Sequence, residues 1–321
     1  MRIRIRPELW LLLLILIGAG CGSGGSSDSS TSTSSGLSRR FLIEPDSLPA
    51  MLRKRGVILL SAQSTLEIAN PGFVNNAIPV DVDDLTTFSE TPDAFTNFAG
   101  WEQRFGALGI TPNSSVIVYD DGELKFASRV RFLLDYFGVR RAWLLNGGFN
   151  ALSPLIESNK LFITTPGPVT PAAFAVQVQD QPIHLVDQQF VLSVLGDPSV
   201  TLLDVRTPAE YDGCFLLPGI KRGGHIPGAR NLPLIDFFTP QADNPELFFL
   251  DAPAKLHSTF LGAELHRHDR IVVYCHDGAQ SSLAAMALIE AGYTDVSLYY
   301  LSYLDWQENP TNPVESIGPC T

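Results

Sequence analysis

The sequence predicts an α/β protein made of two similar halves, each with a central parallel sheet flanked by helices. Short runs of β-branched residues alternate with longer helix-like stretches, as in parallel α/β sheets. The same order of signals occurs twice along the chain. The length of 321 residues exceeds that of one ordinary domain, and 45% hydrophobic residues is a globular composition. Two domains are therefore expected.

The first half contains its predicted elements in a fixed order. A buried strand over residues 57–63 (VILLSAQ) comes first, and a second strand lies within residues 114–122 (SSVIVYDDG). A helix that ends at Gly138 follows this strand. The strand in AWLLNGG, which begins at Ala142, completes the half.

The second half repeats this order. Strands are predicted within residues 200–206 (VTLLDVR) and 270–278 (RIVVYCHDG), followed by a helix over 283–291 that Gly292 closes, and then by the strand VSLYY. Asp120 and Cys275 occupy the same place in the two halves, 155 positions apart. Such an internal repeat implies duplication of one domain.

The N-terminal segment has the features of an export signal. Three arginines within residues 1–6 precede an apolar run over residues 9–17, which is too short to cross a membrane as a helix. Small residues then lead into Cys21 and resemble the lipidation motif of bacterial lipoproteins. We expect residues 1–20 to be a signal peptide and Cys21 to be lipidated, with ordinary cleavage that leaves a plain thiol as the alternative. Residues 21–40 form a Ser/Gly-rich tether.

The remaining boundaries and the predicted location follow from composition. The expected first domain spans 41–165, a proline-rich linker 166–185, the second domain 186–315 and a tail 316–321. The protein is expected to be exported and held by its lipid at the periplasmic or cell-surface side of a bacterial membrane. The chain has 22 basic and 34 acidic residues, a net charge of -12, which excludes a general nucleic-acid-binding role.

Several motifs carry a resemblance to a known family. They are LLDVRTPAEY (202–211), GHIPGARNLP (224–233), YCHDGAQSS (274–282) and LYYLSYLDW (298–306), with VIVYDDG and NGGF in the first half. The chain resembles the two-domain rhodanese family of thiosulfate and 3-mercaptopyruvate sulfurtransferases, and its first half resembles the inactive N-terminal domain of those enzymes. The resemblance implies tandem rhodanese-like domains with one active site, in the second half.

Cys275 is the predicted chemical centre. It follows a strand at the carboxyl edge of the sheet, where open α/β sheets place ligands. The loop residues that follow it lead into a helix: His276, Asp277, Gly278, Ala279, Gln280 and Ser281. Backbone N–H groups of this loop and the helix N-terminus favour a thiolate, with a pKa lowered from about 8.5 to roughly 4 to 7. The alternative is an inert buried cysteine.

The resemblance implies a two-step sulfur transfer. Cys275 would take the outer sulfur of thiosulfate or 3-mercaptopyruvate as a persulfide and pass it to cyanide, a thiol or an acceptor protein, without a cofactor or metal. Asp277 would repel an anionic donor unless it is paired, whereas a protonated His276 would attract one. The donor is therefore left open. The alternative function is a non-catalytic persulfide relay or redox-sensing module.

Three cations of the second half are candidates for donor binding. Lys221 and Arg222 precede the GHIPGA segment, where an ordinary solvated basic pair is the alternative. Arg206 can also be structural, tying the strand end to a carboxylate of its own domain. Residues of the first half can face the site as well, namely Trp101, Lys125 and Arg129.

Single residues bear on three other possibilities: phosphatase chemistry, a metal site and disulfides. A phosphatase of this fold needs an arginine six residues after the cysteine, and Ser281 stands there. The histidines at 257, 266 and 268 suggest a metal patch only loosely, so no metal site is predicted. Cys214 and Cys320 can form a disulfide in an oxidising compartment. A weaker hypothesis pairs Cys214 with Cys275, which would hold the enzyme latent.

Overall fold

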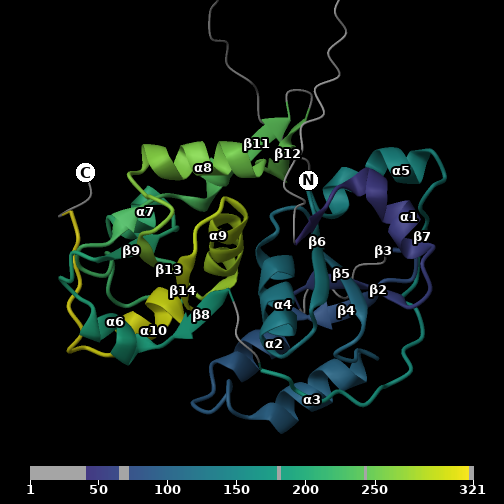
Figure 1. The fold of residues 1–321 in the computed structure, drawn as a ribbon, viewed down its shortest axis with the longest axis horizontal. Helices are drawn as coiled ribbons and strands as arrows, with labels where there is room; N and C mark the ends of the chain where they lie inside the picture. Colours follow the sequence, from purple (N-terminus) through teal and green to yellow (C-terminus); the bar gives the residue numbers. More distant parts are fainter. Residues whose placement is uncertain (1–40, 65–71, 179–181, 242–243, 318–321) are drawn as a thin grey trace, which may run out of the picture. The chain divides into compact units, whose positions relative to one another are not determined.

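The computed structural model describes residues 41–64, 72–178, 182–241 and 244–317 (Figure 1). The predicted signal peptide, Cys21 and the tether lie outside these residues. Among the helices of the described ranges, none combines the length and the apolar character needed to cross a membrane.

The first half is built on a five-stranded sheet in which every strand pair is parallel. The strand order is β1-β6-β5-β2-β4. The bounds are β1 Leu42–Ile43, β2 Val57–Gln63, β4 Ile78–Asp81, β5 Ser115–Tyr119 and β6 Arg141–Leu145. The central strands β2 and β5 are rich in Val, Ile and Leu because both faces of a parallel sheet are covered.

Helices and a small ribbon complete the first half. The helices are α1 Leu48–Leu52, α2 Val82–Ser89, α3 Phe98–Ala107, α4 Lys125–Tyr136 and α5 Ser153–Glu157, with 3-10 turns η1 Pro45–Ser47 and η2 Phe149–Leu152. The strands β3 Phe73–Val74 and β7 Ile163–Thr164 pair antiparallel. Helix α2 begins where the Asp81 carboxylate accepts the amides of Asp83 and Asp84 at 3.0 and 3.2 Å.

The second half has a five-stranded parallel sheet of corresponding order, β10-β9-β13-β14-β8. Its strands are β8 Ile183–Val186, β9 Val200–Asp204, β10 Arg230–Asn231, β13 Arg270–Tyr274 and β14 Asp295–Tyr299. Its helices are α6 Gln188–Ser193, α7 Pro208–Tyr211, η3 Leu234–Phe237, α8 Pro253–Gly262, α9 Ala279–Glu290 and α10 Ser302–Glu308. Figure 1 shows helices flanking both sheets, so the predicted fold class is confirmed.

Three features of the second half differ from the sequence-based prediction. Strand β8 begins at Ile183, inside the segment 166–185 predicted as a linker. Helix α9 begins at Ala279 rather than at 283, because the residues AQSS that follow Gly278 form its first turn. The antiparallel ribbon of β11 Phe238–Gln241 and β12 Asn244–Leu250 is not predicted.

The two halves share one apolar core. Helix α4 packs against α9, and core residues of both helices, such as Val130 and Leu283, belong to one continuous cluster. Polar contacts cross the same boundary: the Ser128 hydroxyl donates to the Ala279 carbonyl at 3.1 Å. The first half therefore touches the beginning of the helix that follows Cys275.

Candidate active site

Cys275 lies directly after the last residue of β13, at the carboxyl edge of the second sheet. Its side chain is fully buried. Gly278, which precedes α9, has φ +97°, and a Cβ on it would approach the Tyr300 carbonyl oxygen to 2.2 Å. Only glycine satisfies both the left-handed conformation and this close approach. The turn that leads from Cys275 into α9 therefore depends on Gly278.

Gly278 and Ser302 both lie against Cys275. The Gly278 amide donates to Sγ at 3.1 Å, as the predicted anion-binding turn requires. The Ser302 hydroxyl lies 3.9 Å from Sγ and accepts the Cys275 amide at 3.1 Å. Ser302 was not singled out in the sequence. It belongs to the segment LYYLSYLDW, which places it beside the strand end.

The predicted lowering of the Cys275 pKa is wrong. Complete burial raises the pKa of the thiol, and the nearby Asp277 carboxylate raises it further. The hydroxyl and amide of Ser281 and the amide of Asp277 act in the opposite direction but do not prevail. The prediction counted the amides and the helix N-terminus, whereas the desolvation of the sulfur arises only from tertiary packing.

Asp277 is paired with a cation of the first half. Its Oδ1 lies 3.0 Å from the Arg129 guanidinium, which also donates to the Asp277 carbonyl at 2.6 Å. Burial opposes ionisation of this carboxyl, but the Arg129 charge and a hydrogen bond from the Ala279 amide lower its pKa below the ordinary value. Asp277 was expected from the sequence to repel an anionic donor unless it is paired, and the Arg129 guanidinium provides that pairing.

His276 does not offer the positive charge considered for it. Burial lowers the pKa of its imidazole, so the ring is neutral near pH 7. Its Nδ1 is buried and has no hydrogen-bond partner within the described residues. The His276 carbonyl accepts the Leu304 amide at 2.9 Å, which ties the loop to α10.

The corresponding turn of the first half holds a carboxylate. Asp120 is buried, and its two oxygens accept four backbone amides at 3.0 to 3.1 Å, those of Gly122, Leu124, Phe126 and Ala127. Burial nevertheless raises the pKa of Asp120 to about 6, against the effect of these amides. The turn between β5 and α4 is therefore a complete anion-binding turn whose anion belongs to the chain itself.

The three predicted donor-binding cations all have protein partners. Arg206 pairs with Asp204 at 2.6 Å and donates to the Gly224 carbonyl at 2.8 Å. Lys221 pairs with Glu308 at 2.9 Å, and Arg222 donates to carbonyl groups that follow α10, those of Asn309 and Asn312. Among the described residues, no hydrogen bond or ion pair joins these cations to the loop 275–281.

A cavity opens beside the loop. It has a volume of about 210 Å³ and includes Gln280 of the loop and Lys125 of α4, with an apolar wall. That wall is formed by Leu234, Ile235, Phe238 and Phe248. Lys125 was only a candidate in the sequence, and the ribbon that supplies Phe238 and Phe248 was not predicted.

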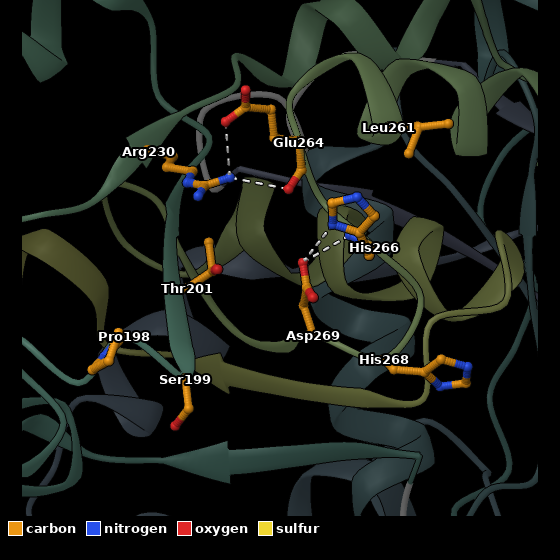
Figure 2. Close-up of a pocket in the computed structure, with 9 residues that line it drawn as sticks. All are labelled: Pro198, Ser199, Thr201, Arg230, Leu261, Glu264, His266, His268 and Asp269. Carbon is orange, nitrogen blue, oxygen red and sulfur yellow. Dashed lines mark hydrogen bonds and ion pairs between the residues drawn. The ribbon is translucent and has the colours of Figure 1, made fainter.

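A second, polar cavity of about 560 Å³ lies at the opposite edge of the second sheet, near the start of β9 (Figure 2). It contains two of the histidines considered as a metal patch. His266 lies 3.5 Å from Asp269, whereas His268 points away from that pair in Figure 2. Across the described ranges, no three His, Cys, Asp or Glu side chains are grouped so that they can hold a metal ion.

The cysteines settle one of the two disulfide hypotheses. Cys275 is a free thiol, and Cys214 is disulfide-bonded. The latent Cys214–Cys275 disulfide is therefore wrong. The other hypothesis, a Cys214–Cys320 disulfide, involves Cys320, which lies outside the described residues.

Two parallel α/β units of corresponding strand order, with a cysteine at one strand end and a carboxylate at the other, define a tandem rhodanese-type protein. The model of the rhodanese-like domain matches residues 44–154 and 187–309. The chain therefore belongs to the rhodanese-like domain family.

Named relatives agree on the class of reaction. The chain is 30% identical to a thiosulfate sulfurtransferase of Azotobacter vinelandii, over 85% of this chain and 96% of that protein. It is 32% identical to a probable 3-mercaptopyruvate sulfurtransferase of Pseudomonas aeruginosa, over 66% and 71% of the two chains. The chain is a sulfurtransferase, with a sulfur donor and a sulfur acceptor as its substrates.

A solved structure matches the fold. An anaerobic ergothioneine biosynthesis enzyme from Chlorobium limicola superposes with a TM-score of 0.72 at 20% identity. The match covers 88% of this chain and 72% of that one. At this identity the likeness concerns the arrangement of helices and strands.

Proposed function

We propose that Cys275 is the nucleophile that carries the sulfur as a persulfide. The donor is thiosulfate or 3-mercaptopyruvate, and the acceptor is cyanide or a thiol. In the first step the Cys275 thiolate bonds to the outer sulfur, and the bond that held this sulfur in the donor breaks, leaving its electron pair on sulfite or on the pyruvate fragment. In the second step the acceptor attacks the terminal sulfur, and the Cys275 thiolate is released.

One observation carries this proposal: a free thiol stands at the carboxyl edge of the sheet, and the amide of the turn that begins α9 donates to it. That hydrogen bond, from Gly278 to Sγ, favours negative charge on sulfur. The Asp120 turn supports the same role, because its four amides surround an anion that extends one atom beyond the γ position. A persulfide on Cys275 extends by the same one atom.

The raised pKa of Cys275 is consistent with this chemistry. A buried, protonated thiol is protected from oxidation in an exported protein. The smaller thiolate fraction is offset in part because intrinsic nucleophilicity rises with the pKa of the thiol. Sulfur transfer is therefore expected to accelerate as the pH rises above neutrality.

The cavity beside Gln280 supports entry of an anionic donor from the side of Lys125. Both donors carry a negative group, and Lys125 supplies a positive charge at the boundary between the two halves. Lys125 is paired with Glu123, an exposed carboxylate that also lines the cavity, so a donor anion binds by replacing this carboxylate. The loop 276–281 then supplies backbone amides to the donor. The cations Arg206, Lys221 and Arg222 bind protein groups rather than the donor.

Export and lipidation at Cys21 belong to the same proposal. They rest on the sequence of residues 1–21. The disulfide at Cys214 supports export, because structural disulfides persist in oxidising compartments. Metabolic labelling with a radioactive fatty acid tests it: the wild-type chain takes up label, and a Cys21→Ala variant that still takes up label contradicts the assignment.

Steady-state assays test the activity itself. Wild-type protein is incubated with thiosulfate or mercaptopyruvate and with cyanide, and thiocyanate is measured. Repeated turnover supports the enzyme. Labelling of Cys275 with one sulfur per chain and no turnover supports the persulfide relay instead.

A further inference from the structure

The half that lacks a reactive cysteine reaches into the Cys275 site through one buried arginine. Arg129 lies on α4 and is 2% exposed. Its guanidinium donates to the Asp277 carbonyl at 2.6 Å and pairs with the Asp277 carboxylate at 3.0 Å. It therefore binds the main chain and the side chain of the same residue, two positions after Cys275.

The position of Arg129 is itself fixed from several sides. It also donates to the Thr86 hydroxyl of α2, and its guanidinium lies 5.9 Å from the centre of the Tyr300 ring. Ser128, the preceding residue, binds the Ala279 carbonyl at 3.1 Å. Two adjacent residues of α4 thus hold the two ends of the segment Asp277–Ala279, and Gly278, the donor to Sγ, lies between them.

The charges of Arg129 and Asp277 also affect the ionisation of the Cys275 thiol. Asp277 is a partly buried carboxylate close enough to the thiol to oppose its ionisation. Arg129 is the cation that faces this carboxylate, and it also interacts with the charge on Cys275. The other ionisable groups around them are Glu90 at the end of α2, His276 and Tyr300. Without Arg129, a thiolate would share its buried surroundings with an uncompensated carboxylate.

We propose that Arg129 is a positioning residue of the Cys275 site: it fixes the turn that donates to sulfur and cancels the charge of Asp277 beside the thiol. This inference rests on the proposed role of Cys275. It gives the first half an indirect part in the chemistry, through Asp277, although Asp120 prevents that half from carrying sulfur. Arg129 and Asp277 therefore act as a pair.

The test measures the rate of Cys275 alkylation by iodoacetamide as a function of pH in the full chain. Arg129→Gln is expected to move the midpoint of the profile up by about one pH unit, because the Asp277 charge is then uncompensated. Asp277→Asn is expected to move it down, since the opposing charge is removed while an oxygen acceptor for Arg129 and Ala279 remains. In the Asp277→Asn background, Arg129→Gln is expected to shift the midpoint less than it does alone.

Arg131 provides the matched control. It is a second buried arginine of α4 and contacts Asp135 and Met286 rather than the loop. Arg131→Gln is expected to leave the midpoint unchanged even if it lowers the melting temperature. Arg129→Lys is expected to keep the midpoint close to that of the wild type while slowing alkylation, because one ammonium cannot make both contacts to Asp277.

The outcomes separate this inference from the proposed function. Equal midpoints in the wild type, Arg129→Gln and Asp277→Asn overturn the inference, and the Asp277→Asn variant keeps the test decisive if Arg129→Gln does not fold. Alkylation requires no sulfur donor. A shifted profile in a protein that never forms a persulfide would therefore support the role of Arg129 and contradict the proposed function.

Discussion

The turns after β5 and after β13 are two versions of one structure with different groups at the strand end. Each leads through a left-handed residue, Leu124 at φ 59° or Gly278 at φ 97°, into a helix of 12 residues. In both turns the amide of that residue donates to the strand-end side chain, at 3.0 Å to Asp120 and at 3.1 Å to Cys275. The backbone therefore favours an anion in both halves.

The difference lies in what fills the turn. The Asp120 carboxylate satisfies the amides from within the chain, because its two oxygens accept four of them. The Cys275 side chain ends one atom earlier, and in our proposal its sulfur gains and loses a second sulfur atom. The same backbone thus serves stability in the first half and, in our proposal, group transfer in the second.

The largest expected effect is on activity, and it distinguishes substitutions at the two strand ends, Cys275 and Asp120. Cys275→Ser is expected to reduce thiocyanate formation to background, because a hydroxyl cannot carry sulfane sulfur. Asp120→Asn is expected to retain turnover within a few fold of the wild type. Steady-state assays on both purified variants check this. Residual turnover in Cys275→Ser would place the nucleophile elsewhere.

The second prediction concerns Gly278. Gly278→Ala is expected to lower the rate of sulfur transfer by about a hundredfold, the scale seen when one donor to a reacting anion is lost. The added Cβ collides with the Tyr300 carbonyl and displaces the amide that donates to Sγ. Gly292→Ala is the matched control, since Gly292 also has a positive φ of 90° but ends α9 far from Cys275. Both variants lose stability, and only the first should lose the reaction.

The third prediction uses the raised pKa of Asp120, which is about 6 in the folded chain. A raised folded-state pKa means that the folded state binds the proton more tightly than the unfolded chain does. The stability associated with this proton is fully present below about pH 4 and is lost as the pH rises through about 6. The difference amounts to at most about 3 kcal/mol at 1.36 kcal/mol per pH unit.

Urea unfolding at a series of pH values checks this. The free energy of unfolding of the wild type should contain a decrease between pH 4 and pH 6 that is missing from Asp120→Asn, whatever the absolute stability of the variant. Parallel curves for the two proteins would show that Asp120 has an ordinary pKa and that burial does not raise it.

The smallest expected effect concerns donor binding. Lys125→Gln is expected to raise the KM for thiosulfate roughly tenfold with little change in kcat, because one charged contact to the donor is lost. Lys221→Gln is the control: Lys221 is exposed and paired with Glu308, so its KM should match that of the wild type. The reverse result would restore Lys221 as the donor-binding residue that the sequence suggested.

Much of the fold can be predicted from the sequence because the repeat is carried by apolar strands. The strands β2, β5, β9 and β13 lie within the segments predicted for them. The edge strand β8 was missed because IHLV follows a proline-rich stretch and is short. The β11–β12 ribbon was missed because its pairing joins segments whose alternation is interrupted by Pro240.

The site was predictable at the strand end and in its turn. Cys275 and Gly278 stand where the motif places them, and the hydrogen bond between them agrees with the expected anion-binding turn. The direction of the thiol pKa was not predictable, because it depends on burial and on the distance to Asp277. Arg129 was a candidate to face the site, but its partner Asp277 was not predictable, since the two are 148 residues apart in the chain.

Mass spectrometry of the Cys275 peptide tests the central claim most directly. Purified protein is incubated with thiosulfate or with mercaptopyruvate, digested without reductant and compared with the Cys275→Ser variant. The account predicts a gain of about 32 Da, one sulfur atom, on the Cys275 peptide with at least one donor, and its loss after cyanide is added. An unchanged Cys275 peptide in a protein that still produces thiocyanate would contradict it.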